Sequence, residues 1–257
     1  MLSWERSINI KSSFELSIMR EAGRINAEAL SAAVALIKPG VTTGELNAAF
    51  EAVQAKYDVY SPFKNYPGPY PYPASICTSI NDELVHGIPG KRKLKEGDII
   101  SIDAGTVYQG FVGDMAVTVG VGDVSEQTER LMTVTKKALD IAISKMVPGN
   151  TTGDIGHAVE TFVESQGLHI TRTYTGHGVG RKMHEGPQVP NYGKPGRGMR
   201  LREGMTIALE PMVLVGTSHT RVKEDEWTVA SEDGSLTAHY EHTVAVTANG
   251  PEILTLL

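Results

Sequence analysis

Apolar side chains recur every three or four positions along four stretches of the chain, which is the spacing of one face of an α-helix. The first stretch begins at Ser12, where Ser12 and Glu15 have the spacing of a capping box, and it ends before Pro39. We expect this helix and three further helices, over residues 42–57, 125–146 and 151–166.

Apolar runs typical of β-strands follow each pair of helices. Residues 98–104 and 111–119 predict two strands joined around Tyr108-Gln109-Gly110. In the C-terminal part we expect strands over residues 205–215, 227–231 and 236–247. The order helix, helix, then strands therefore occurs twice along the chain.

Residues 60–76 contain closely spaced prolines interleaved with aromatic side chains. Proline has no N–H group to donate to a neighbouring strand, so this segment cannot be a central strand. We predict a rigid loop between the first helices and the first strands.

Two short segments return later in the chain at nearly the same spacing. Residues 39–46 resemble residues 148–155 at an offset of 148 − 39 = 109, and residues 94–103 resemble residues 201–210 at an offset of 201 − 94 = 107. Such self-similarity indicates repeated structural units. We expect one catalytic domain over residues 1–257, built from similar halves of about 12–122 and 123–250 that join near residues 120–125.

The overall composition is that of a globular protein with no nucleic-acid or membrane partner. Of the 257 residues, 40% are hydrophobic and 21% are charged, and no run approaches the roughly 20 apolar residues that cross a bilayer. The N-terminus has no apolar core of a secretory signal, which favours a cytoplasmic location. The net charge of −6 disfavours binding to a phosphate backbone, and we interpret the basic run at residues 91–95 as a solvated turn.

Cys77 is the single cysteine, so neither an internal disulfide nor a zinc site built from thiolates can form. A thiol nucleophile at this position is conceivable. A neutral, buried thiol that lines a pocket is the simpler interpretation.

Four carboxylates stand within or beside strand-like apolar runs: Asp103, Asp114, Glu210 and Glu241. Any one of them could be an edge residue facing water. If Asp103 and Asp114 meet across adjacent antiparallel strands, their like charges destabilise the sheet unless a cation lies between them. Because the repeat places Glu210 where Asp103 stands, we expect all four in one pocket between the halves, with room for two divalent cations.

Among the eight histidines, His177 lies between Gly176 and Gly178, which allow the backbone to approach a site closely. His184 corresponds to His86 at an offset of 184 − 86 = 98, within similar surrounding sequences. These three histidines are candidates for the site. We interpret four others as structural: His157, His169, His219 and His239.

The sequence resembles type I methionine aminopeptidases from about residue 10 to the C-terminus. The segments that carry the resemblance are residues 77–89, 101–118, 175–190, 206–212 and 240–247. The resemblance implies the α+β pita-bread fold, with two pseudo-symmetric halves and an antiparallel sheet flanked by helices. It also implies metal-dependent removal of the N-terminal methionine from nascent proteins, with a preference for a small second residue.

The resemblance implies a dinuclear metal site and assigns roles within it. Asp103 would chelate one metal ion, Asp114 and Glu241 would bridge, and His177 and Glu210 would complete the other. Glu210 would also act on the bridging water. The two other catalytic residues are histidines: His86 would contact the substrate and the tetrahedral intermediate, and His184 the peptide beyond the scissile bond. Two cations in such a site lower the pKa of a shared water and polarise the scissile carbonyl.

The resemblance further implies a methionine pocket and accessory ions. The pocket would be formed by Tyr66, Tyr72, Cys77, Met183 and Trp227. Residues Asn81, Glu83 and Thr237 match a monovalent-cation site of some relatives. The divalent ions could be Co, Mn, Fe, Zn or Ni, since a carboxylate-rich site with one imidazole accepts each of them.

The expected partners are peptides and nascent polypeptides with N-terminal methionine, with transient ribosome association, and the chain is expected to be monomeric. Two alternatives remain. An X-Pro aminopeptidase or prolidase would share the fold and ligands, although such enzymes usually carry a separate N-terminal domain. A non-catalytic binding protein that lost its metals would usually have lost ligand residues, whereas all five are present here.

Overall fold

The computed structural model describes residues 8–257. Its elements, in chain order, are α1 (Ser13–Val34), α2 (Thr43–Lys56), β1 (Ile76–Ile80), β2 (Glu83–Val85), β3 (Ile99–Tyr108), β4 (Phe111–Gly120), α3 (Glu126–Ser144), α4 (Thr152–Ser165), β5 (His169–Ile170), β6 (Gly176–Gly178), β7 (Glu185–Val189), β8 (Thr206–Leu209), β9 (Met212–Leu214), β10 (Thr220–Val222), β11 (Val229–Ser231), β12 (Thr237–His239), β13 (Glu241–Thr247) and β14 (Gly250–Ile253).

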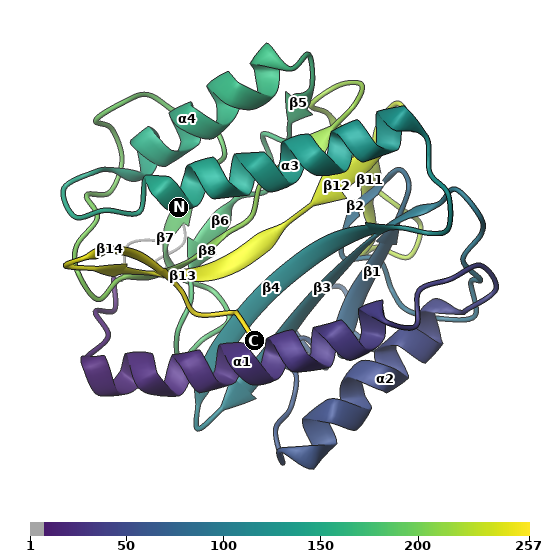
Figure 1. The fold of residues 1–257 in the computed structure, drawn as a ribbon, viewed down its shortest axis with the longest axis horizontal. Coiled ribbons are helices and arrows are strands. Elements are labelled where there is room, and N and C mark those ends of the chain that lie inside the picture. Colours follow the sequence, from purple (N-terminus) through teal and green to yellow (C-terminus); the bar gives the residue numbers. More distant parts are fainter. Residues whose placement is uncertain (1–7) are drawn as a thin grey trace.

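A curved antiparallel sheet runs through the centre of the molecule (Figure 1). Its strand order is β1-β3-β4-β13-β8-β6-β7, with β14 paired to β13. Strands β1, β3 and β4 come from the first half of the chain and the others from the second, so the halves meet where β4 pairs with β13. Two further antiparallel sheets contain the strands β10-β11-β2 and β12-β9-β5.

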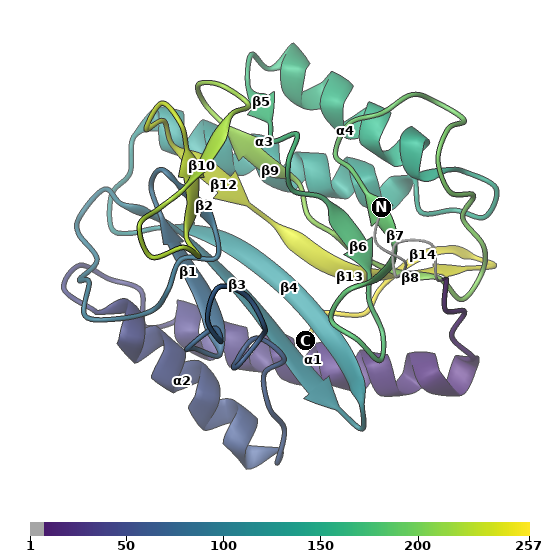
Figure 2. The same ribbon diagram turned by 180° about the vertical axis from the view of Figure 1, so that it is seen from behind.

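The four helices cover one side of the central sheet. Helices α1 and α2 lie against the first half and α3 and α4 against the second (Figure 1), and the view from behind shows β2 and β10 on the opposite side (Figure 2). Apolar side chains between helices and sheet form a separate core in each half. The α+β architecture expected from the sequence is therefore confirmed. No helix within residues 8–257 is both long and apolar enough to cross a bilayer.

Capping boxes at Ser12, Thr42 and Thr151 start three of the helices. In each box the hydroxyl accepts a hydrogen bond from the third helical residue, whose carboxylate accepts one from the backbone N–H of the cap. Each cap contributes about 1 kcal/mol. The local spacing of hydroxyl and carboxylate residues therefore predicted these helix starts.

Equivalent backbone hydrogen bonds occur in both halves, with donors that are 149 − 40 = 109 and 204 − 97 = 107 residues apart. Gly40 N donates to Leu94 O, and Gly149 N donates to Leu201 O. Gly97 N likewise donates to Val121 O, as Gly204 N does to Val246 O. The repeated sequence segments thus make repeated contacts in three dimensions.

Several predicted elements have different limits in the structure. Helix α1 ends at Val34 rather than at the residue before Pro39, and Leu36 N and Ile37 N close the end with tighter bonds to residues three positions back. The chain then turns before Pro39, whose ring disfavours helical backbone at Lys38. Strand β3 extends to Tyr108, beyond the expected residue 104, because the β3–β4 hairpin pairs along its whole length.

Two predicted strands are each divided in the structure. The expected strand 205–215 is split into β8 and β9 at Glu210-Pro211, and the expected strand 236–247 is split into β12 and β13 at Tyr240. Pro211 has no N–H to donate to the ladder, so it ends the pairing of β8. At both breaks the chain passes from one sheet to another, next to a candidate ligand.

Candidate active site

One face of the central sheet carries the candidate carboxylates of the first half. In the β3–β4 register Asp103 is opposite Ala116 and Asp114 is opposite Gly105. Asp103 and Asp114 are therefore diagonal neighbours on the same face, not a directly opposed pair. The two-residue offset separates their backbones and leaves room above Ala116.

The register of the second half brings its ligands to the same face. Glu241, the first residue of β13, lies opposite Ala116, and Thr243 lies opposite Ala208. Ala208 in turn lies opposite His177 of β6. Since directly opposed residues point to one side of a sheet, these positions share a face with Asp103 and Asp114.

His177 is held with one ring nitrogen turned toward the carboxylates. Its Nδ1 is 2.9 Å from the carbonyl oxygen of Gly178, while its Nε2 is 3.6 Å from Asp114 Oδ2 and 3.5 Å from Glu210 Oε1. Burial, reinforced by the nearby His184, lowers the pKa of His177 to about 3. A neutral imidazole that donates Nδ1–H to the carbonyl leaves the Nε2 lone pair available for a metal.

The glycines on either side of His177 are required by close packing. A Cβ atom on Gly176 would lie 2.6 Å from Ala208 O, and one on Gly178 would lie 2.1 Å from Gly186 O. Any larger residue would push the strand away from its neighbours. The close backbone approach that these glycines predicted therefore occurs in β6, between β7 and β8.

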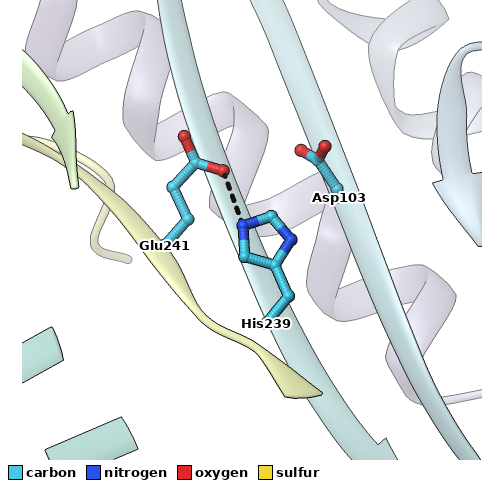
Figure 3. A group of neighbouring side chains, drawn as sticks. All are labelled: Asp103, His239 and Glu241. Atoms are coloured by element: carbon cyan, nitrogen blue, oxygen red, sulfur yellow. Dashed lines mark ion pairs between the residues drawn. The ribbon is translucent and has the colours of Figure 1, made fainter. Parts of the chain in front are cut away.

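His239 also lies in this cluster, although sequence reasoning treated it as structural. Its side chain is 2% exposed, and its Nε2 is 3.6 Å from Glu241 Oε2 and 3.8 Å from Glu210 Oε2 (Figure 3). The three other histidines that we set aside, His157, His169 and His219, are exposed. The available signal was alternation, because His239 stands two positions before Glu241 and the expected strand over residues 236–247 would put both side chains on one face.

The carboxylates of the cluster lack the positive charge that burial requires. Burial raises the pKa of Asp103, Glu210 and Glu241, with mutual repulsion adding to it, and it raises the pKa of Asp114 to about 7. Within residues 8–257 none of the four forms an ion pair with lysine or arginine. Buried charges are normally paired or bound to metal ions.

The donor set fits divalent metal ions. In the described part of the chain, buried side-chain atoms without a hydrogen-bond partner include Asp103 Oδ1, Asp114 Oδ1, Glu241 Oε1 and both ring nitrogens of His239. Two groups have ligand atoms that all lie within 4.8 Å of one another: Asp114, His177 and Glu241, and Asp103, His239 and Glu241. Carboxylate oxygens and imidazole nitrogens are the ligands that Mn, Fe, Co and Zn accept.

A cavity of about 190 Å³ opens over these side chains. Every residue that we expected to bind divalent metal or substrate lines it: His86, Asp103, Asp114, His177, His184, Glu210, Glu241, Tyr66, Tyr72, Cys77, Met183 and Trp227. Sequence reasoning missed five further lining residues: Phe63, Val85, Tyr174, Thr175 and Met212. Val85, Thr175 and Met212 each lie within two positions of an expected residue, so proximity in the chain was the available signal.

His86 and His184 both line the cavity, as expected from the sequence. His86 has a positive φ of 62°, a strained conformation that commonly marks functional residues. His184 Nδ1 is 2.7 Å from the hydroxyl of Tyr66, and its ring centroid is 4.3 Å from that of His177. Burial lowers the pKa of both His86 and His184 to about 4, so both are neutral near pH 7.

Aromatic side chains enclose the apolar end of the cavity. The hydroxyl of Tyr72 donates to the carbonyl oxygen of Gly87 at 2.9 Å, and its ring meets Trp227 edge-on at 5.1 Å. Trp227 Nε1 donates to Tyr70 O at 3.2 Å. Burial raises the pKa of Cys77, so its thiol is neutral and fits a pocket wall better than a nucleophile.

The three residues of the expected monovalent-cation site also meet. Thr237 N donates to Asn81 O at 2.9 Å, and Thr237 Oγ1 donates to Glu83 O at 2.8 Å. The Glu83 carboxylate is paired with Arg92 and Lys223. The carbonyl oxygens of Asn81 and Glu83 are thus next to Thr237.

The chain is similar to known proteins over nearly its whole length. The model of metallopeptidase family M24 matches residues 17–248. A methionine aminopeptidase of Clostridium acetobutylicum is 50% identical over 250 residues, which cover 97% of this chain and 99% of that protein. The solved methionine aminopeptidase of Thermotoga maritima superposes with a TM-score of 0.95 at 46% identity and covers 98% of this chain and 100% of its own. A prolidase from Pyrococcus horikoshii, at 24% identity, shares the fold with a TM-score of 0.77 over 63% of its length.

Proposed function

The chain belongs to the methionine aminopeptidases of metallopeptidase family M24, with their pita-bread fold, and we propose that five side chains of the cavity hold two divalent metal ions. The reaction is metal-dependent hydrolysis that releases an N-terminal methionine from a peptide or protein. The proposed ligands are Asp103, Asp114, His177, Glu210 and Glu241.

One observation carries the ligand assignment: unpartnered buried carboxylate oxygens gather on a single face of the sheet. Leaving such atoms buried without a partner costs about 1–3 kcal/mol each, and more when they are charged. Two cations remove this cost and cancel the repulsion among the carboxylates. In this assignment Asp114 and Glu241 would be shared by the two ions, Asp103 would hold one of them, and His177 and Glu210 would hold the other.

In this proposal, residues around the metal site carry out the other steps of the hydrolysis. When bound, the two cations lower the pKa of a water molecule, bind the substrate α-amine and polarise the scissile carbonyl. Glu210 takes the proton of the attacking water as general base, and that proton passes to the leaving amine when the C–N bond breaks. Neutral His86 donates a hydrogen bond to the substrate and stabilises the tetrahedral intermediate, and His184 contacts the peptide beyond the scissile bond.

The apolar end of the cavity supplies selectivity for methionine. Tyr66, Tyr72, Cys77, Met183 and Trp227 offer the aromatic and sulfur surfaces that a thioether side chain contacts favourably. Tyr66 and His184 both line the cavity of about 190 Å³ and contact each other, and in this proposal His184 faces the second substrate residue. This arrangement supports the preference for a small second residue.

We also propose an oligomeric state, a cellular location and a choice of metal ions for the enzyme. We propose a single catalytic domain over residues 1–257 that acts as a cytoplasmic monomer on nascent chains, with transient association with the ribosome. The metal ions would be two of Co, Mn, Fe, Zn or Ni, selected by availability. A monovalent cation would bind at the site formed by Asn81, Glu83 and Thr237.

Methionine release from Met-Ala-Ser by chelator-treated protein, as Co(II) or Mn(II) is titrated back, tests the proposal. Activity should return as two ions bind, and Asp103→Ala, His177→Ala and Glu210→Ala should each abolish turnover in a folded protein. Wild-type rates in any of these variants would remove that residue from the site. Hydrolysis of an X-Pro peptide in place of Met-Ala-Ser would favour a prolidase activity, and no activity with any metal would favour a binding protein.

A further inference from the structure

His239 is a buried imidazole without any hydrogen bond. Its side chain is 2% exposed, and neither Nδ1 nor Nε2 has a hydrogen-bond partner among residues 8–257. A histidine buried for structural reasons normally donates from one ring nitrogen and accepts at the other. His177, in the same cluster, follows this rule through Gly178 O. The environment of His239 therefore lacks the partners that a packing role would provide.

The ring of His239 points into the space between carboxylates. Figure 3 shows it between Glu241 and Asp103, which come from different strands. Its Nε2 is 3.6 Å from Glu241 Oε2, too far for a hydrogen bond. Two atoms that bind one metal ion at about 2.1 Å each lie about 3 to 4 Å apart, so this separation is that of two ligands.

The distance from His239 to Glu210 can be compared with that from His177, the expected ligand, to the same carboxylate. Its Nε2 is 3.5 Å from Glu210 Oε1, and the Nε2 of His239 is 3.8 Å from Glu210 Oε2. One carboxylate thus has an imidazole nitrogen beside each of its oxygens. The histidine implied as a ligand by family resemblance and the unassigned histidine occupy similar positions around Glu210.

The ligand atoms form two triads of the same composition. One contains Asp114, His177 and Glu241, and the other contains Asp103, His239 and Glu241, each within 4.8 Å. Each triad offers one aspartate and one histidine, and they share Glu241. The ion nearer Asp103, which otherwise has only oxygen ligands, thereby gains a nitrogen donor.

We propose that His239 is a direct ligand of the metal ion bound by Asp103, so that each ion of the centre is coordinated by one imidazole. This inference rests on the proposed dinuclear site and adds a ligand to it. A nitrogen ligand at that position shifts its metal preference toward zinc, cobalt or nickel and away from manganese, which prefers oxygen ligands.

Zinc X-ray absorption of the wild-type protein loaded with two zinc ions tests the proposal without any substitution. Outer-shell scattering from imidazole rings should correspond to about one imidazole per zinc on average. If only His177 binds, the average falls to about one half. The lower value overturns the proposal.

Isothermal titration of zinc into the chelator-treated protein provides the second measurement. His239→Gln should weaken binding of one ion by at least 10- to 100-fold, roughly what loss of even an outer partner costs a metal site. His177→Gln is the positive control. His242→Gln is the matched negative control, because His242 is three positions after His239 and its Nδ1 contacts Thr255 Oγ1, away from the cavity. Circular dichroism of each metal-free variant establishes that it is folded.

The outcomes separate this inference from the proposed function. Unchanged zinc affinity in His239→Gln, with loss in His177→Gln, would refute the role of His239 and leave the dinuclear aminopeptidase intact. Unchanged affinity in both variants, or no zinc bound by the wild type, would refute the proposed ligand set and this inference together. If His239→Gln does not fold, the imidazole count of the wild-type protein decides.

Discussion

Asp103 and Glu241 lie opposite the same residue, Ala116, from the two strands that flank β4. They are 241 − 103 = 138 residues apart in the chain, yet they form one row across the sheet with Ala116 between them. The small side chain of Ala116 leaves free the space into which both carboxylates point. The pocket between the halves therefore depends on the small size of Ala116, whose side chain has no metal-binding or catalytic group.

We predict that Ala116→Leu prevents metal binding. Ala116 is 1% exposed, and a larger side chain on its face would occupy the position between Asp103 and Glu241. Overpacking at such a site costs about 1–3 kcal/mol, so the variant should fold with reduced stability. Zinc titration calorimetry should show at least about a 10-fold loss of affinity. Val117→Leu, one residue along on the other face, is the control, and equal affinities in the two variants would contradict the prediction.

The stability of the metal-free protein should fall as pH rises. Burial raises the pKa of Asp114 from 3.8 to about 7. A group whose folded pKa is raised stabilises the folded state fully below pH 3.8, and this contribution is lost as pH rises to 7. Metal ions compete with the protons, so the increase in Tm caused by zinc should grow between about pH 5 and pH 8.

Thermal unfolding at several pH values, with and without zinc, measures this effect. In Asp114→Asn the increase in Tm should be small at every pH, because the ligand is absent. An increase in wild-type Tm that is independent of pH would show that zinc displaces no protons from the carboxylates.

Tyr66→Phe should slow catalysis by disturbing His184. The Tyr66 hydroxyl is 2.7 Å from His184 Nδ1 and fixes the orientation of the ring. Loss of a hydrogen bond worth about 1.5 kcal/mol corresponds to a drop in kcat/KM of roughly 10-fold. Steady-state kinetics with Met-Ala-Ser provides the measurement, and zinc affinity should stay the same. Tyr60→Phe, at an exposed tyrosine of the same loop, should have no effect; a wild-type rate in Tyr66→Phe would show that His184 needs no such support.

Trp227→Ala should relax selectivity for methionine more than it harms metal binding. The Trp227 ring packs so closely against Gly68 that a Cβ there would lie 2.4 Å from its Cη2, and it meets Tyr72 edge-on. Removing it opens the apolar end of the cavity to other side chains. Rates on Met-, Leu- and Phe-Ala-Ser peptides should converge, by about 10-fold or more relative to the wild type. An unchanged substrate profile would exclude Trp227 from the methionine pocket.

Local patterns in the sequence predicted the elements that depend on neighbouring residues. Ser12 with Glu15, and Thr42 with Glu45, fixed helix starts because a capping box involves only four consecutive positions. Carboxylates within apolar strand patterns identified Asp103 and Asp114 as unusual. Glycines around His177 indicated a close approach of the backbone, which the structure shows in a strand between two others.

The expectations that were wrong depended on contacts distant in the chain. The periodicity over residues 205–215 and 236–247 continued through positions where the structure breaks each strand and moves the chain to another sheet. The ligand role that we propose for His239, which the sequence led us to interpret as structural, likewise depends on distant residues. Its neighbours, Asp103 and Glu210, come from elsewhere in the sequence.

The sequence by itself determined the kinds of residue in the site and the order of the helices and strands, since capping, alternation and repeats are local properties. Only the tertiary structure decided the register that puts Asp103, Ala116 and Glu241 in one row. A shift of one residue turns a strand's side chains to the opposite face, and packing of the two halves against their helices selects the register. The same packing directs the unpartnered ring of His239 toward the carboxylates.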